Sequence, residues 1–360
     1  MDTVQINDVH NLENAILKQR EKLNQMRKLV KELKFVPVDP VGYYSCVTYK
    51  AIDGGKMNID FDPFEIDYVE IADSNENVLL KFVVPLGIQM EKTDFSTLDQ
   101  MPTIKTFLDI FKAKSITDIS EIWNDPTKIM ELAEYACIFE KIIQESDKNK
   151  FLIMKDGLLR TKALKAEYFK DLIQILSKSK SIKLVGVSKS SKLLSMISSA
   201  IHLEKIFPPD KTGYVAIPLD LELMAYTWTG HGLIKEKNEP LDYALGQLYV
   251  AKLSPKSDLL VTTEIPYDLK EDKPIYNSGE INEIFGHLVK DSMYSYPNLG
   301  YAQTIMRAHE KAVKLGFTAS IIRDKIMDKC LDGLDPELQN TIREYNLFKE
   351  SVKKGSLGGI

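Results

Sequence analysis

The sequence has few cysteines and no paired cysteine motif. Cys46, Cys137 and Cys330 lie far apart in the 360-residue chain, and none belongs to a CxxC pair. This spacing argues against a disulfide framework and against a structural zinc site. A chain without disulfides is typical of a reducing compartment, so we expect a cytoplasmic protein.

Long apolar runs and nucleotide-binding glycine motifs are missing as well. No apolar run reaches the ~20 residues that span a bilayer, and the polar, acidic segment from Met1 to Asn11 does not resemble a signal peptide. We therefore expect no association with a membrane. The sequence contains no Walker-type or dinucleotide glycine motif. Any ATP hydrolysis on which this protein depends must therefore be carried out by another protein.

An excess of basic residues is also absent. The 47 Lys and Arg residues are outnumbered by 52 Asp and Glu residues, which gives a net charge of -5. A simple nucleic-acid binder is usually basic, so this balance argues against broad coating of DNA. It leaves room for a local basic channel or an acidic metal site. The hydrophobic content of 44% is that of an ordinary globular protein.

The first part of the chain predicts an amphipathic helix over residues 11–34. Its apolar residues follow a heptad spacing: Leu12, Ile16, Leu23, Met26, Val30 and Leu33. Such a helix either packs on its own domain or contacts a second subunit. We divide the chain into this helical segment at 1–36, with a dimer or partner contact, a main domain at 37–345, and a flexible tail at 346–360.

The main domain begins with a pattern of short strands. Strands are expected at 43–53, 57–61, 66–72 and 78–85, with turns at Gly54-Gly55 and at 75–77. Helices at 103–112, 127–145 and 163–178 and strands at 151–155 and 182–187 follow. A meander followed by strand, helix and strand predicts an α/β fold with an RNase H-like mixed sheet flanked by helices. Further strands at 214–218, 245–253 and 259–265 form an extra β-rich insertion.

Two aspartates follow apolar strands directly, and each precedes a glycine. Asp53 follows Cys46–Ile52, and Asp156 follows Phe151–Lys155. An Asp-Gly pair at a strand end is often only a turn. If the two strands are adjacent and parallel, however, both carboxylates project from the same edge of the sheet, where α/β sheets place their sites. Paired carboxylates suit Mg²⁺ or Mn²⁺, and two such ions can stabilise the attacking and leaving oxygens in phosphodiester cleavage.

A third carboxylate is expected from the helix at 127–145. The candidates are Glu131, Glu134 and Glu140, and all three also suit a solvated helix face. The strand at 151–155 rises roughly 16 Å at ~3.3 Å per residue. A helix that rises ~1.5 Å per residue must step back about eleven residues from its end near 145 to match that height. This favours Glu134, leaves Glu131 open, and places Glu140 too near the other end.

Several motifs in this order resemble the NurA nuclease family. An Asp-Gly follows the first strand (Ile52-Asp53-Gly54-Gly55), and a second ends a later strand (Ile153 to Arg160). A strand leading into a lysine and serines follows at Leu184 to Ser191. Tyr301 lies eight residues before His309, which stands in an Ala-His context. The similarity covers residues 45 to 316.

The chain departs from the family pattern at three places. Gly55 stands where the family has serine, Leu158 stands where a smaller residue is usual, and the prolines between the tyrosine and the histidine are missing. A Tyr296-Pro297 pair lies just upstream, so Tyr296 competes with Tyr301 as the family tyrosine.

The resemblance implies roles for individual residues. Asp53, Glu134 and Asp156 would bind Mn²⁺ or Mg²⁺, and His309 would be a further ligand or would orient the phosphate. Lys189 would offset charge at the phosphate. Without the resemblance, His309 would be interpreted as a core histidine and Lys189 as a surface charge.

The resemblance also implies a function and partners. The protein would be a metal-dependent DNA nuclease, both endo- and exonucleolytic, in DNA repair or in antiviral defence against foreign DNA. It would act as a homodimer with a HerA-like hexameric ATPase. The alternatives are a catalytically inactive DNA-binding or scaffold subunit of the same complex, and an interaction protein whose Asp-Gly pairs are only turns.

Overall fold

The computed structural model describes most of the chain. The described residues are 6–42, 47–61, 64–86, 95–120, 125–145, 150–189, 191, 194–229 and 242–357. Cys46 and the start of the strand predicted at 43–53 lie outside them. None of the helices in these ranges has both the length and the hydropathy that a membrane span requires.

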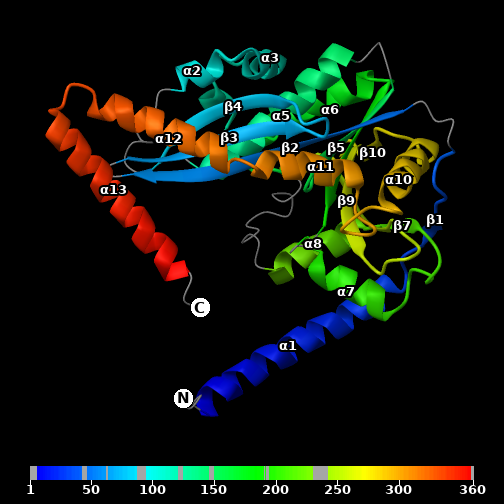
Figure 1. Ribbon diagram of the computed structural model, residues 1–360. Helices are drawn as coiled ribbons and strands as arrows, with labels where there is room; N and C mark the ends of the chain where they lie inside the picture. The colour runs from blue at the N-terminus through cyan, green and yellow to red at the C-terminus, as the bar shows by residue number, and fades with distance from the viewer. Residues whose placement is uncertain are drawn as a thin grey trace.

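A mixed sheet of ten strands forms the centre of the described structure (Figure 1). Its strand order is β1-β7-β8-β9-β6-β5-β2-β3-β4, with β10 paired to β9. The strands are β1 (Val36–Pro37), β2 (Thr48–Phe61), β3 (Phe64–Asp73), β4 (Val78–Pro85), β5 (Phe151–Asp156), β6 (Ile182–Ser188), β7 (Gly213–Ala216), β8 (Gly246–Lys252), β9 (Leu260–Asp268) and β10 (Lys273–Pro274).

Half of this sheet has the RNase H-like arrangement that the sequence predicts. Strands β2, β3 and β4 form an antiparallel meander, and β5 and β6 join β2 in parallel. The fold class is therefore confirmed as α/β with a mixed sheet flanked by helices, consistent with the RNase H-like class. The predicted β-rich insertion extends this sheet, because β9 pairs antiparallel with β6, β8 with β9, and β7 with β8.

One local prediction about the meander is wrong. The turn expected at Gly54-Gly55 does not form, because β2 continues from Thr48 to Phe61 and Asp53 pairs with Ala72 inside the ladder. Asp53 is therefore a mid-strand residue. The strand ends expected at 78–85, 151–155 and 182–187 agree with the structure to within one residue.

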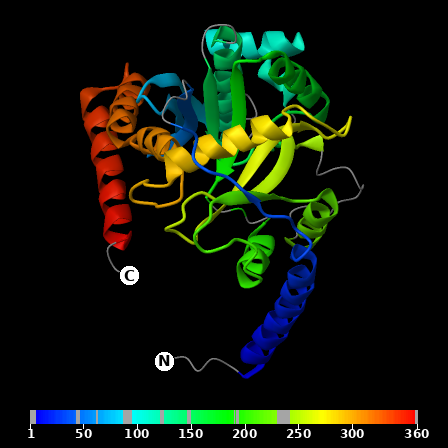
Figure 2. The ribbon, with the colours of Figure 1, turned by 90° about the vertical axis from the view of Figure 1, so that its right-hand side faces the viewer.

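Helices cover both faces of the sheet. One face packs against α3 (Pro102–Phe111), α5 (Pro126–Glu145) and α6 (Phe169–Lys178), and together they bury a large apolar cluster. The opposite face packs against α10 (Ser278–Ser292) and α11 (Gln303–Val313). Figure 2 shows α10 crossing this face. The short helices α2 (Ser96–Asp99) and α4 (Ile116–Ile119) and a 3₁₀ turn at Ala166–Tyr168 complete the first layer.

The remaining helices lie around the sheet. Helix α1 (Ile6–Val30) packs its end against α7 (Ser195–Leu203) and projects away from the body (Figure 1). A third apolar cluster joins these two helices to α8 (Leu219–Thr229). Helices α12 (Gly316–Leu331) and α13 (Pro336–Leu357) follow α11. The predicted boundary at 36/37 falls inside β1, and the predicted boundary at 345/346 falls inside α13. The division of the chain into 1–36, 37–345 and 346–360 stays a prediction.

Candidate metal centre

Two aspartates lie side by side where β2 and β5 run in parallel. The two strands are paired up to the residue before each aspartate, so Asp53 and Asp156 occupy neighbouring positions. Side chains alternate along a strand. Ala51 and Met154, two residues earlier, belong to the apolar cluster on the α11 face of the sheet. Both carboxylates therefore point to the face that α11 covers.

His309 on α11 completes a group of three metal-ligating side chains. Its Nδ1 lies 2.8 Å from Asp53 Oδ2 and 3.6 Å from Asp156 Oδ2. One ligand atom from each residue lies within 4.8 Å of the other two, an arrangement that no other His, Cys, Asp or Glu group in the described ranges has. Asp53 is 6% exposed, whereas the His309 side chain is 56% exposed. The group is thus buried at its base and open on one side, and His309 is not a core residue.

The donors of this group fit a divalent cation. Burial raises the pKa of Asp53 and the negative charge of Asp156 raises it further, while the contact with His309 lowers it. A divalent cation between the two carboxylates would remove this mutual repulsion. Carboxylate oxygens suit Mg²⁺ and Mn²⁺, and an imidazole nitrogen suits the softer transition metals.

The position of His309 depends on two contacts of α11. At the start of the helix, Asp291 of α10 accepts hydrogen bonds from the Thr304 amide at 3.0 Å and from its hydroxyl at 2.8 Å. A carboxylate at this place caps free amides of the first turn. At the other end the helix lies directly on β2: a Cβ at Gly55 would lie 1.8 Å from the Ala312 carbonyl oxygen.

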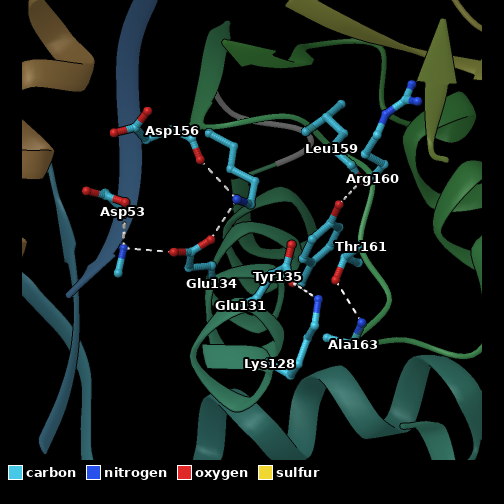
Figure 3. Close-up of polar contacts among 12 residues, drawn as sticks. Asp53, Lys128, Glu131, Glu134, Tyr135, Asp156, Leu159, Arg160, Thr161 and Ala163 are labelled. Carbon is cyan, nitrogen blue, oxygen red and sulfur yellow. Dashed lines mark hydrogen bonds and ion pairs between the residues drawn. The ribbon is translucent and has the colours of Figure 1, made fainter. Parts of the chain in front are cut away.

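Glu134 lies behind the aspartates, on the face of the sheet that α5 covers. Its Oε1 accepts a hydrogen bond from the Gly54 amide at 3.0 Å, and its Oε2 is 2.7 Å from Lys155 Nζ (Figure 3). Burial raises the pKa of Glu134 to about 7, although the charge of Lys155 acts in the opposite direction. Burial alone would lower the pKa of Lys155, but the neighbouring carboxylates, Glu134 first, raise it.

The structure thus distinguishes the three candidate glutamates. Glu134 is the one that reaches the backbone beside Asp53. Glu131 is 3.6 Å from Lys128 on its own helix, and Glu140 accepts a hydrogen bond from Thr103 at 3.0 Å. Glu134 is not a member of the three-residue group on the α11 face, so its role as a metal ligand stays a prediction.

The two candidate tyrosines occupy different environments. Tyr301 is 4% exposed, and its hydroxyl donates a hydrogen bond to Asp156 Oδ1 at 2.7 Å. Burial and the negative charge of Asp156 raise the pKa of Tyr301, which keeps it protonated. Tyr296 is 83% exposed. Lys189, which is exposed, places its Nζ 5.9 Å from the centre of the Tyr301 ring. The predicted Tyr301 therefore contacts Asp156 directly, and Lys189 lies over the ring of Tyr301.

A buried charge network holds the loop after Asp156, and the sequence interpretation missed it. Glu264 of β9 is 0% exposed, and its Oε2 accepts hydrogen bonds from the Leu159 amide at 3.0 Å and the Arg160 amide at 3.1 Å. The Arg160 side chain forms ion pairs with Glu264 at 3.0 Å and with Glu222 of α8 at 2.6 Å. The only signal for it was an isolated acidic residue inside the apolar strand predicted at 259–265.

The family model described as the NurA domain matches residues 35–208. A search of curated protein sequences found no match.

Solved structures similar to this chain include several NurA proteins. The NurA nuclease from Sulfolobus solfataricus is 10% identical, with 91% of this chain and 98% of that chain covered and a TM-score of 0.46. A structure of NurA with manganese is 11% identical, with coverages of 91% and 98% and a TM-score of 0.40. One of NurA bound to dAMP and manganese is 8% identical, with coverages of 86% and 93% and a TM-score of 0.40.

Proposed function

We propose that this chain, whose residues 35–208 match the model of the NurA domain, is a NurA family protein and a metal-dependent nuclease that hydrolyses phosphodiester bonds of DNA. The observation that supports this most is the cluster of Asp53, Asp156 and His309, with ligand atoms within 4.8 Å of one another. Two carboxylates at a solvent-open position suit a hydrolytic Mn²⁺ or Mg²⁺ site, and the imidazole adds a nitrogen donor.

Each residue around the cluster has a separate task in this proposal. Asp53, Asp156 and His309 hold the metal, which when bound would polarise the phosphate and activate water. Tyr301 fixes the orientation of Asp156 through its 2.7 Å hydrogen bond. Lys189, exposed beside Tyr301, stabilises negative charge that develops on the phosphate.

Glu134 has a different position and a different task. Its ion pair with Lys155 and its hydrogen bond from Gly54 fix the backbone of both aspartate strands. We propose that Glu134 also contributes to the metal site, as a ligand or through a water molecule, when a metal is bound.

Partners and biological role follow from the same family membership. We propose that the protein works as a homodimer with a HerA-like hexameric ATPase in the cytoplasm, in DNA end processing or in degradation of foreign DNA. Helix α1 suits such an interface because it projects from the body and exposes Ile16 and Leu17. The sequence has no nucleotide-binding motif of its own, which is consistent with a separate ATPase.

The proposal is tested by incubating the purified protein with linear DNA and Mn²⁺, alongside Asp53→Ala and Asp156→Ala. Asp332→Ala serves as a matched control, because Asp332 is exposed after α12. We expect degradation by the wild type and the control and none by the two site variants. Degradation that survives both site substitutions contradicts the assigned site. No degradation by the wild type, even with the ATPase present, favours an inactive scaffold.

A further inference from the structure

The loop between α10 and α11 presents two tyrosines to solvent. Tyr294 is 72% exposed and Tyr296 is 83% exposed. We propose that this pair, which we call the tyrosine platform, stacks on unpaired bases of a DNA strand whose backbone lies at the metal cluster. The inference rests on the proposed nuclease function, and it adds a binding site for single-stranded DNA next to that cluster.

The backbone that presents these rings is held in place. The Tyr296 amide donates a hydrogen bond to Gln303 Oε1 at 3.0 Å, and the Gly300 amide donates to the Ser292 carbonyl at 3.1 Å. Ser295, which stands between the two tyrosines in the sequence, is buried, and its hydroxyl donates a hydrogen bond to the Asn298 carbonyl at 2.7 Å. A constrained loop with aromatic rings loses little conformational freedom when it binds a ligand.

The platform lies at the same edge of the sheet as the metal cluster. Its loop continues into Tyr301, whose hydroxyl contacts Asp156. The loop also packs on the turn between β8 and β9, where the Ser254 hydroxyl donates to the Met293 carbonyl at 3.2 Å. The turn between β8 and β9 lies next to the end of β6, because Ser188 at the end of β6 pairs with Thr262 near the start of β9. The loop that bears the platform therefore lies at the end of the sheet where β5 carries Asp156, and we propose that a DNA strand held at the cluster also reaches the platform.

The charges around the platform suit a polyanion that contains bases. Lys256 Nζ lies 5.2 Å from the centre of the Tyr294 ring, and Lys189 Nζ lies above Tyr301. Each lysine lies over one ring, and cations beside aromatic rings suit the binding of single strands, because cations contact phosphates while rings stack on bases. Within residues 293–302 no Leu, Ile, Val or Met side chain is exposed, and Pro297 is the one exposed residue besides the two tyrosines. This composition favours a nucleic acid over an apolar protein surface.

The test compares binding of two fluorescent oligonucleotides of equal length, one normal single strand and one abasic strand. Binding is measured by anisotropy in EDTA, so that cleavage does not contribute. The proteins are the wild type, Tyr294→Ala/Tyr296→Ala and Tyr294→Phe/Tyr296→Phe. Tyr345→Ala is the control, because Tyr345 is 56% exposed on α13, away from this edge.

We expect the alanine pair to weaken binding of the normal strand about ten-fold or more and to leave binding of the abasic strand unchanged. The phenylalanine pair and Tyr345→Ala should bind like the wild type. Equal binding by all four proteins, including no binding at all, would overturn the inference. So would an equal loss for both strands, which indicates a charge effect or misfolding.

Cleavage by the same proteins in Mn²⁺ separates this inference from the proposed function. A wild type that prefers the normal strand through its tyrosines but never cleaves would leave the platform standing and contradict the nuclease. A wild type that cleaves without this preference would contradict the platform alone.

Discussion

Gly55 determines how closely α11 approaches β2. The Ala312 carbonyl occupies the space that a side chain would need, since a Cβ at Gly55 would lie 1.8 Å from its oxygen. Gly54 has no room for a side chain on the opposite face of the sheet, because a Cβ there would lie 2.6 Å from Glu134 Oε1. The two glycines thus permit close packing on both faces of one continuous strand. In the sequence alone, a Gly-Gly pair needed for close packing looks the same as a Gly-Gly pair in a turn. The prediction of a turn at Gly54-Gly55 was wrong for this reason.

The change Gly55→Ser, toward the residue that the family has, should push α11 away from the strand. We expect a loss of about 1–3 kcal/mol in the free energy of unfolding, as is typical when a packed site is overfilled. The Mn²⁺-dependent stabilisation should also fall, because His309 moves with the helix. Thermal unfolding with and without Mn²⁺ measures both effects.

Gly316→Ala is the control for this change. Nothing lies within 4 Å of a Cβ at Gly316, so alanine should be neutral or slightly stabilising there. A serine variant at Gly55 with unchanged stability and an unchanged response to Mn²⁺ would contradict the role of this close contact.

Other features of the site could be predicted from the sequence. Asp53 and Asp156 were expected to lie together if the two apolar strands before them were adjacent and parallel, and β2 and β5 meet this condition although β2 continues past Asp53. The comparison of strand rise with helix rise favoured Glu134 over Glu131 and Glu140, and Glu134 is the glutamate that contacts β2. The competition between Tyr296 and Tyr301 needed the structure, because sequence spacing does not show which ring is buried.

At the scale of elements, α10 links the sheet to the helix that bears His309. The sequence interpretation missed α10, although Asn277 and Glu280 have the spacing of a capping box, and both hydrogen bonds of the box form. Strands with strong apolar runs were predicted closely. Helix starts were predicted less well: the helix expected at 163–178 begins at Phe169.

His287 on α10 should make stability depend on pH. It is 2% exposed, and its Nδ1 lies 2.9 Å from the Tyr49 hydroxyl of β2. Burial lowers the pKa of His287 from 6.5; the carboxylate of Glu283 raises it, and Lys290 lowers it. As the pH falls below 6.5, the unfolded histidine takes up a proton and the folded one does not. The free energy of unfolding therefore falls from pH 6.5 down to the lowered pKa, and this contribution is constant below it.

Urea denaturation of wild type and His287→Gln at pH 7.5, 6.5 and 5.5 measures this contribution. We expect the difference between the two proteins to change with pH below 6.5, by at most about 1.4 kcal/mol per pH unit for one group. Other titrating groups cancel in the difference. Parallel pH profiles for the two proteins would show that His287 does not titrate differently on folding.

At the scale of the whole molecule, the order of elements along the chain was enough to predict the RNase H-like half of the sheet. It was not enough to show that β7, β8 and β9 extend the same sheet, because antiparallel pairing of β9 with β6 depends on contacts between distant segments. The Glu264 network is of the same kind, since it joins β9, α8 and the loop after Asp156.

The proposed nuclease requires that Asp53, Asp156 and His309 bind a divalent metal. A Mn²⁺ titration followed by thermal unfolding tests this binding, with wild type, Asp53→Ala, Asp156→Ala and Asp332→Ala. Bound metal stabilises the folded state by about 2.7 kcal/mol at a hundred times Kd. We predict a stabilisation of wild type and Asp332→Ala that EDTA reverses and that both site variants lack. An equal response from all four proteins, or none from the wild type, would contradict the account.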